Sequence, residues 1–282
     1  SAGETSPNIF YIILDGYGRE DILEDYYEFD NSEFINSLID RGFYVASESR
    51  SNYNQTALSL ASSLNLAYLD AFNFVSNHSS NRHPLVELIK DNRLISFLRE
   101  QGYTIISFEN GFEQIDSDIF LSVNNRSVTS FETLILETSV FRVPYDLFDI
   151  SPPYPDYDLH RKRILYIMDG LAQVAKMSER KFVFAHIIAP HPPFVFGSNG
   201  EEVTPDYPFV LNDGSGYPGS TQEYKSFYIN QVIFLNKLVI QTLDAILANS
   251  ESPPIIVLQA DHGPAAYLEW DSVEKSCIRE RV

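Results

Sequence analysis

The sequence predicts an α/β protein with a doubly wound, mainly parallel β-sheet and helices on both faces. Three observations lead to this prediction. Apolar runs rich in Ile, Val, Phe and Tyr alternate along the chain with helical patterns. These runs are mostly apolar on both faces, as expected for strands covered on either side. With 282 residues, 44% of them hydrophobic, the chain can bury a large core, and we expect one domain over residues 1–282.

The element boundaries follow from the apolar spacing. We expect strands at 8–14, 43–49, 103–108, 182–188 and 254–260. We expect helices at 32–41, 56–65, 92–101, 128–138, 158–179 and 221–248. In the first helix Ser32 stands at the start and Gly42 closes the end, while the last helix is apolar along one broad face.

Two stretches interrupt the alternation. Residues 141–157 are rich in Pro, Tyr and Asp, and residues 190–220 carry six prolines and five glycines. Loops of this length in a compact domain are commonly functional. We expect both to form the rim of a site at the carboxyl edge of the sheet.

The charge and cysteine content exclude some classes of function. The net charge of −19 argues against binding to nucleic acid or to an anionic membrane surface. Cys277 is the single cysteine, so no disulfide forms within the chain, which is compatible with the cytosol and with a bacterial extracellular domain. We see no run of the ~20 apolar residues that a spanning helix needs, and residues 1–7 show no signal-peptide pattern.

Metal-binding side chains follow the first and last apolar runs. Asp15 ends the run that begins at Ile9, and Asp261-His262-Gly263 follows the run 254–260. Because the carboxyl ends of parallel strands meet at one edge of a sheet, we expect these side chains to converge there. Carboxylate and imidazole groups together indicate one divalent-cation site. As single residues, Asp15 and Asp261 are equally well explained as turn residues.

Three further residues complete the candidate site. Thr56 opens a helix, where a metal-activated hydroxyl would be a nucleophile, although a plain N-cap threonine fits the same position. His186 and His191 lie in the segment A-H-I-I-A-P-H-P-P-F, and a core histidine and an exposed loop histidine are the plain alternatives. We include Asn54, Arg50 and His186 as candidate substrate contacts.

In this order, the motifs resemble those of the alkaline phosphatase/sulfatase superfamily. The chain has T-A-L-S-L-A from Thr56 and A-D-H-G from Ala260, and the similarity covers nearly the whole chain. It is greatest to the phosphoethanolamine transferase and lipoteichoic acid synthase branch. The resemblance implies an alkaline phosphatase-like fold and a phosphoryl-transfer enzyme, either a phosphoester hydrolase or a phospho-head-group transferase. It also implies a lipid, glycan or small-molecule phosphoester as substrate.

The resemblance assigns a role to each motif residue. Asp15, Thr56, Asp261 and His262 would bind Zn²⁺ or Mn²⁺, with Mg²⁺ or Ca²⁺ as further options. Thr56 would attack phosphorus and carry a phosphothreonine intermediate. His191 would contact the transferred group or the leaving oxygen. The resemblance also implies an extracytoplasmic domain of a bacterial membrane-anchored protein, or a cytoplasmic one if no membrane segment precedes it.

The sequence departs from the family pattern at several points. The transferase branch usually has Glu at the first ligand, where this chain has Asp15, as the hydrolase and sulfatase branches do. The formylglycine motif C-x-P-x-R is absent, which argues against a type I sulfatase. Two-metal members need a further Asp/His/His set, for which His186 and His191 are candidates. Members also continue past D-H-G, so we expect this domain to be truncated at its C-terminus.

Two alternatives from other classes stay open at this point. One is a catalytically silent sulfatase-like domain that binds a glycan or a lipid head group. Within the enzyme hypothesis, a sulfuric-ester hydrolase is a variant. A doubly wound nucleotide-binding enzyme is disfavoured, because neither G-x-G-x-x-G nor G-x-x-x-x-G-K-[ST] occurs. The sequence identifies neither the substrate nor the oligomeric state.

Overall fold

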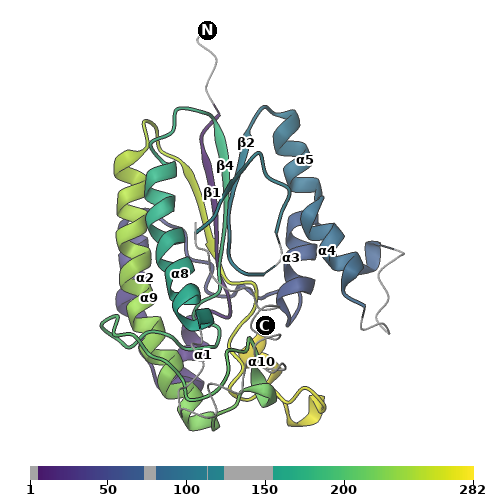
Figure 1. Cartoon of the computed structure of the whole chain (residues 1–282), viewed down its shortest axis with the longest axis vertical. Coiled ribbons are helices and arrows are strands. Elements are labelled where there is room, and N and C mark those ends of the chain that lie inside the picture. The colour runs from purple at the N-terminus through teal and green to yellow at the C-terminus, as the bar shows by residue number, and fades with distance from the viewer. Residues whose placement is uncertain (1–5, 73–80, 113, 124–154) are drawn as a thin grey trace, which may run out of the picture.

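A parallel β-sheet forms the centre of the molecule (Figure 1). The computed structural model describes residues 6–72, 81–112, 114–123 and 155–282. In this part of the chain the strand order is β3-β2-β4-β1-β5, and every pairing is parallel. The strands are β1 (Ile9–Leu14), β2 (Thr104–Phe108), β3 (Ile119–Leu121), β4 (Lys181–Ile187) and β5 (Ile255–Gln259).

Helices cover both faces of the sheet, which confirms the predicted fold class (Figure 1). One face carries α2 (Ser32–Asp40), α8 (Pro155–Val174) and α9 (Thr221–Asn249). The other carries α3 (Thr56–Asn65), α4 (His83–Lys90) and α5 (Arg93–Glu100). Successive β1 side chains point to opposite faces, so Phe10 and Ile12 join the first core while Tyr11 and Ile13 join the second.

The helix α9 is long and apolar enough to cross a membrane, judged by length and composition alone. It contributes Leu235, Val239, Leu243 and Ile246 to the core beneath α8. A core helix passes the same test, and 39% of the apolar window in α9 is buried, so length and composition alone do not distinguish a spanning helix from a core helix.

Most predicted elements match the structure within a few residues, but the strand expected at 43–49 is wrong. That segment has no regular hydrogen-bonded structure. Phe43 and Val45 pack against the core while Tyr44 is 91% exposed, so the segment alternates like a strand without pairing with one. The short strand β3 and the helices α1 (Glu20–Tyr27), α4 and α10 (Ile278–Arg281) were not predicted.

The two stretches expected to be long loops, 141–157 and 190–220, differ in the structure. The segment 190–220 is irregular, as expected, apart from an isolated antiparallel bridge between Phe196 and Glu202 and a 3-10 turn at Gly214–Gly216. Residues 155–157 of the other stretch begin α8 instead of continuing a loop, while 141–154 and the helix expected at 128–138 lie outside the described residues. Ser32 is the first residue of α2, as expected, but it does not cap the helix. The N-cap position is Asn31, which makes no side-chain cap bond, and Asp30 Oδ1 accepts the Ser32 N–H at 2.9 Å.

Candidate metal centre and active site

Three adjacent strands, β4, β1 and β5, deliver the candidate ligands to one edge of the sheet. Asp15 directly follows β1, and Asp261 and His262 follow β5. Ligand atoms of these three buried residues all lie within 4.8 Å of one another. We call Asp15, Asp261 and His262 the ligand cluster. It joins residues from the two ends of the sequence.

Lone pairs in the ligand cluster face one another. Asp15 Oδ1 and Asp261 Oδ2 are buried and lack a hydrogen-bond partner among the described residues. His262 Nδ1 lies 2.9 Å from the Gly263 carbonyl and donates to it, which leaves Nε2 as the unprotonated nitrogen. That nitrogen lies 3.2 Å from Asp261 Oδ2 and 3.6 Å from Asp15 Oδ1.

This arrangement fits a divalent cation. Buried polar atoms without partners are rare, and converging acceptors repel unless a positive charge lies between them. An imidazole whose second nitrogen bonds to a carbonyl is the usual orientation of a metal-ligating histidine. Burial and the positive charge of Arg281 also lower the pKa of His262, which keeps the imidazole neutral and able to bind a metal.

Asp15 is held by a chain of hydrogen bonds. Its Oδ2 lies 3.1 Å from His186 Nε2, and His186 Nδ1 lies 3.0 Å from Asn110 Nδ2. The Asn110 Oδ1 accepts the Phe112 N–H, so the amide nitrogen donates to His186 and His186 donates to Asp15. Burial raises the pKa of Asp15, but the charge of His191 and the His186 hydrogen bond outweigh it and lower the pKa.

His186 is therefore a hydrogen-bond partner of Asp15. It is 1% exposed, and burial lowers its pKa while the bond and charge of Asp15 raise it by more. Its hydrogen-bond partners are Asp15 and Asn110, and the Phe112 ring meets its ring edge-on. We interpret His186 as a support for the first ligand.

Thr56 brings its hydroxyl to the ligand cluster. It is the first residue of α3, as predicted, and follows Gln55 in extended conformation. Its Oγ1 lies 3.1 Å from His262 Nε2. The preceding loop is tied to the helix by Ser59, whose hydroxyl donates to the Tyr53 carbonyl at 2.8 Å. The half-buried Thr56 thus stands between the buried ligands and open space.

His191 lies on the other side of Asp15. Its backbone N–H donates to the Asp15 carbonyl at 2.9 Å. The ring Nδ1 lies 2.6 Å from the Pro192 carbonyl, so Nδ1 is the donor there. Nε2 lies 3.5 Å from Asp213 Oδ2 and is the nitrogen available to a bound group.

A second buried cluster was missed by the sequence analysis. Asp213 Oδ2 pairs with Arg281 Nη1 at 2.5 Å, and its Oδ1 accepts from the Tyr224 hydroxyl and the Gly214 N–H, both at 2.9 Å. We call Asp213, Arg281 and Tyr224 the anchored cluster. Asp213 lies within the irregular 190–220 segment and Arg281 near the end of the chain, so neither follows a strand and no motif marks them.

The two clusters share one pocket. A cavity of about 380 Å³ is lined by Asp15, Thr56, His191, Asp213, Arg281 and Trp270, among others. It places the Thr56 hydroxyl, His191 and Arg281 around the same space. The pocket is large enough for a phosphate or sulfate ester head group.

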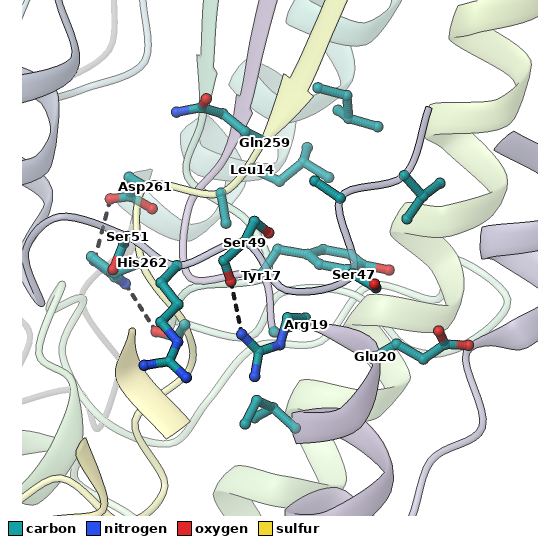
Figure 2. Close-up of a pocket in the computed structure, with 18 of the residues that line it drawn as sticks. Leu14, Tyr17, Arg19, Glu20, Ser47, Ser49, Ser51, Gln259, Asp261 and His262 are labelled. Atoms are coloured by element: carbon teal, nitrogen blue, oxygen red, sulfur yellow. Dashed lines mark hydrogen bonds and ion pairs between the residues drawn. The ribbon is translucent and has the colours of Figure 1, made fainter. Parts of the chain in front are cut away.

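A larger groove of about 550 Å³ lies on the other side of the ligand cluster. Figure 2 shows it, with Asp261 and His262 at one end and Glu20 at the other. Its lining includes the exposed Arg50, and Arg19 Nη1 donates to the Ser49 carbonyl there at 2.8 Å. Arg50 thus lines the groove, while Asn54 meets the site through its backbone, since its carbonyl accepts from Arg281 Nε at 2.8 Å.

The sheet and the cluster at its carboxyl edge define an α/β protein of the alkaline phosphatase/sulfatase type. Residues 7–273 match the Sulfatase family, and the chain belongs to that family. This confirms the resemblance inferred from the motifs. A search among curated proteins gives no match.

Solved structures agree on the fold. The C-terminal periplasmic domain of the phosphoethanolamine transferase EptC from Campylobacter jejuni aligns with a TM-score of 0.55 and 10% identity, over 96% of this chain and 76% of that one. The corresponding domain of EptC from Escherichia coli, in complex with Zn, aligns with a TM-score of 0.51 and 12% identity, over 97% of this chain and 68% of that one. At these identities the alignments establish the shared fold.

Proposed function

We propose that this protein is a metal-dependent phosphoryl-transfer enzyme with Thr56 as its nucleophile. One observation carries the proposal: two unpartnered buried carboxylate oxygens and a bare imidazole nitrogen converge beside a half-buried threonine hydroxyl. The family of the chain and its EptC-like fold support the same reaction class. We also propose that residues 1–282 form one domain that acts outside the cytoplasm, as the EptC domains do.

Asp15, Asp261, His262 and the Thr56 hydroxyl would hold the cation. The imidazole favours Zn²⁺, while the oxygen ligands also suit Mn²⁺, Mg²⁺ or Ca²⁺. When bound, the cation neutralises negative charge on the phosphoryl oxygens and lowers the pKa of the hydroxyl that it touches.

Thr56 performs the first half of the reaction. Its hydroxyl gives its proton to solvent, its Oγ1 forms a bond to phosphorus, and the bond from phosphorus to the leaving oxygen breaks. His191 Nε2 faces the pocket and, when protonated, can give its proton to the departing oxygen.

The second half regenerates Thr56. Water or an acceptor hydroxyl attacks phosphorus, the bond between phosphorus and Oγ1 breaks, and Oγ1 recovers a proton. Water as the acceptor gives a phosphoester hydrolase, and an alcohol or sugar hydroxyl gives a transferase.

A phosphoester turnover assay tests this function. Protein stripped with a chelator and reloaded with Zn²⁺ or Mn²⁺ should release p-nitrophenol from p-nitrophenyl phosphate or from its diester. Mass spectrometry of the quenched reaction should find a phosphate adduct on Thr56. Turnover of p-nitrophenyl sulfate alone would favour the sulfuric-ester alternative, and ion binding without turnover of either ester would favour the silent binding domain.

A further inference from the structure

Arg281 is the one buried guanidinium in the pocket of Thr56 among the described residues, and it is only 2% exposed. Three acceptors hold it in place. Nη1 bonds to Asp213 Oδ2 at 2.5 Å and to the Gly263 carbonyl at 3.0 Å, and Nε donates to the Asn54 carbonyl at 2.8 Å. Arg281 is therefore fixed between the loop before Thr56 and the loop after the ligand cluster.

The remaining nitrogen of Arg281 faces the metal ligands. Nη2 lies 3.3 Å from His262 Nε2, the same nitrogen that lies 3.1 Å from Thr56 Oγ1. A cation bound at the ligand cluster needs the lone pair of His262 Nε2. Nη2 would then lack that acceptor, and an N–H of a buried guanidinium requires one. An oxygen of an anion attached to, or approaching, Thr56 would supply it.

Charge balance supports the same role. Asp15, Asp261 and Asp213 are buried carboxylates at this edge of the sheet. A divalent cation compensates the first two, and Arg281 compensates Asp213, so that the loaded site is close to neutral before substrate enters. The dianion of a phosphate monoester can then approach without meeting an uncompensated carboxylate.

Two of the groups that a second metal ion would need are already engaged. Within the described part of the chain, the ligand cluster is the single group of three or more converging metal ligands. His186 donates to Asp15, and Asp213 Oδ2 is occupied by Arg281. A guanidinium stands where a second cation would otherwise balance Asp213.

We infer that Arg281 is the second positive charge of a one-ion site and binds the anionic group that Thr56 attacks. This inference rests on the proposed function. The planar guanidinium suits the task because it keeps two nitrogens on its anchors while the third binds an oxygen of a tetrahedral anion. The backbone explains its position: a methyl group on Gly263 would overlap the Glu280 carbonyl oxygen, so the glycine allows the chain before Arg281 to approach the ligand cluster.

Titration calorimetry with inorganic phosphate tests the inference on metal-loaded protein. Elemental analysis should find one ion per chain in the wild type and in Arg281→Gln. Phosphate affinity should fall about 10- to 100-fold in Arg281→Gln, the range expected for losing a hydrogen bond to a charged group. Arg281→Lys should bind phosphate with intermediate affinity, because lysine keeps the positive charge but lacks the paired N–H groups of the guanidinium.

Arg41→Gln is the matched control, since Arg41 also pairs with an aspartate, Asp244, but at an exposed position outside the pocket. It should bind phosphate like the wild type. Unchanged phosphate affinity in a folded, ion-loaded Arg281→Gln would overturn the inference, as would two ions per wild-type chain. If the glutamine variant fails to fold, wild-type affinity in Arg281→Lys overturns it equally.

The outcomes separate this inference from the proposed function. Ester turnover with an unchanged phosphate affinity in Arg281→Gln rejects the role of Arg281 and leaves the enzyme hypothesis standing. Ion-dependent phosphate binding that is lost in Arg281→Gln, without turnover of any ester, supports the anion site and rejects the reaction.

Discussion

The ligand cluster and the anchored cluster lie at the same edge of the sheet and are equally buried. They differ in whether the oxygens of their carboxylates have hydrogen-bond or ion-pair partners. In the anchored cluster, Asp213 has a hydrogen bond or ion pair at both oxygens. In the ligand cluster, Asp15 and Asp261 each keep one buried oxygen without a partner. A buried charge is tolerated when it is paired. The chain itself supplies the partners of the anchored cluster, but it does not supply all the partners that the ligand cluster needs.

The difference separates a supporting carboxylate from a ligand. Burial raises the pKa of Asp213, but the charge of Arg281 together with the neighbouring histidines and the Tyr224 hydrogen bond lowers it by more, so the side chain is ionised by protein partners. Asp15 is also ionised, but its free oxygen points at two other ligand atoms. Burial and charge are therefore common to both clusters, and the missing partner marks the metal site.

Replacing the nucleophile should have the largest effect of any change near these clusters. We expect Thr56→Ala to lower kcat by about 10³-fold or more, because the covalent step needs the hydroxyl. Its melting temperature and ion content should stay close to wild type, since all three residues of the ligand cluster remain. The measurement pairs phosphoester kinetics with elemental analysis, and Ser59→Ala on the same helix serves as control. Turnover near the wild-type rate in Thr56→Ala would reject the role.

Breaking the anchored cluster should destabilise the fold. Asp213→Asn removes the charge that compensates the buried Arg281, and such changes cost about 3–5 kcal/mol. Urea unfolding of the ion-free protein measures this loss. Asp244→Asn, which breaks the exposed pair with Arg41, should cost about 1 kcal/mol or less. Equal losses in the two variants would contradict the contrast between the buried pair and the exposed one.

The same substitution in the ligand cluster should have the opposite sign. In ion-free protein, Asp261→Asn removes a buried charge whose Oδ2 has no partner, keeps the bond from the Gly16 N–H to Oδ1, and gives His262 Nε2 an amide donor. Stability should therefore rise by about 1–3 kcal/mol. Added Zn²⁺ should raise the melting temperature of the wild type and leave this variant nearly unchanged. The test is thermal unfolding with a chelator and with Zn²⁺. A variant that is less stable than the wild type without metal would show that Asp261 is a structural carboxylate.

The contrast between the clusters also explains what the sequence could and could not predict. Asp15, Asp261 and His262 follow buried apolar strands, and parallel strands end at one edge, so their convergence was predictable. Thr56 was predictable as the first residue of a clear helix. Asp213 lies in an irregular segment and Arg281 ends the four-residue helix α10, and the two pair only after folding, so no periodic pattern indicates them. The false strand at 43–49 has a related cause, because alternating burial of Phe43 and Val45 arises from packing without strand pairing.

His160 Nε2 is a third buried atom without a hydrogen-bond partner, but it lies outside the ligand cluster. It therefore shows how a missing partner affects stability where no other metal ligands converge. His160 is buried on α8 beside the ring of Phe209. Burial lowers its pKa from 6.5 to about 3, so the folded protein keeps it neutral while the unfolded chain protonates it below pH 6.5. The unfolded state therefore binds more protons in that range, and the stability due to neutral His160 is complete above pH 6.5 and is lost as the pH falls towards 3.

His160→Asn should flatten that pH dependence. We expect the wild-type free energy of unfolding to fall between pH 6.5 and 4.5 more steeply than that of the variant, by up to about 1.4 kcal/mol per pH unit. Urea unfolding at three pH values on ion-free protein measures the slopes. His83→Asn, at an exposed position on α4, should leave the slope unchanged. Parallel slopes for wild type and His160→Asn would mean that His160 is already protonated in the folded protein. Its unpartnered nitrogen would then belong to a charged group, as the unpartnered oxygens of the ligand cluster do.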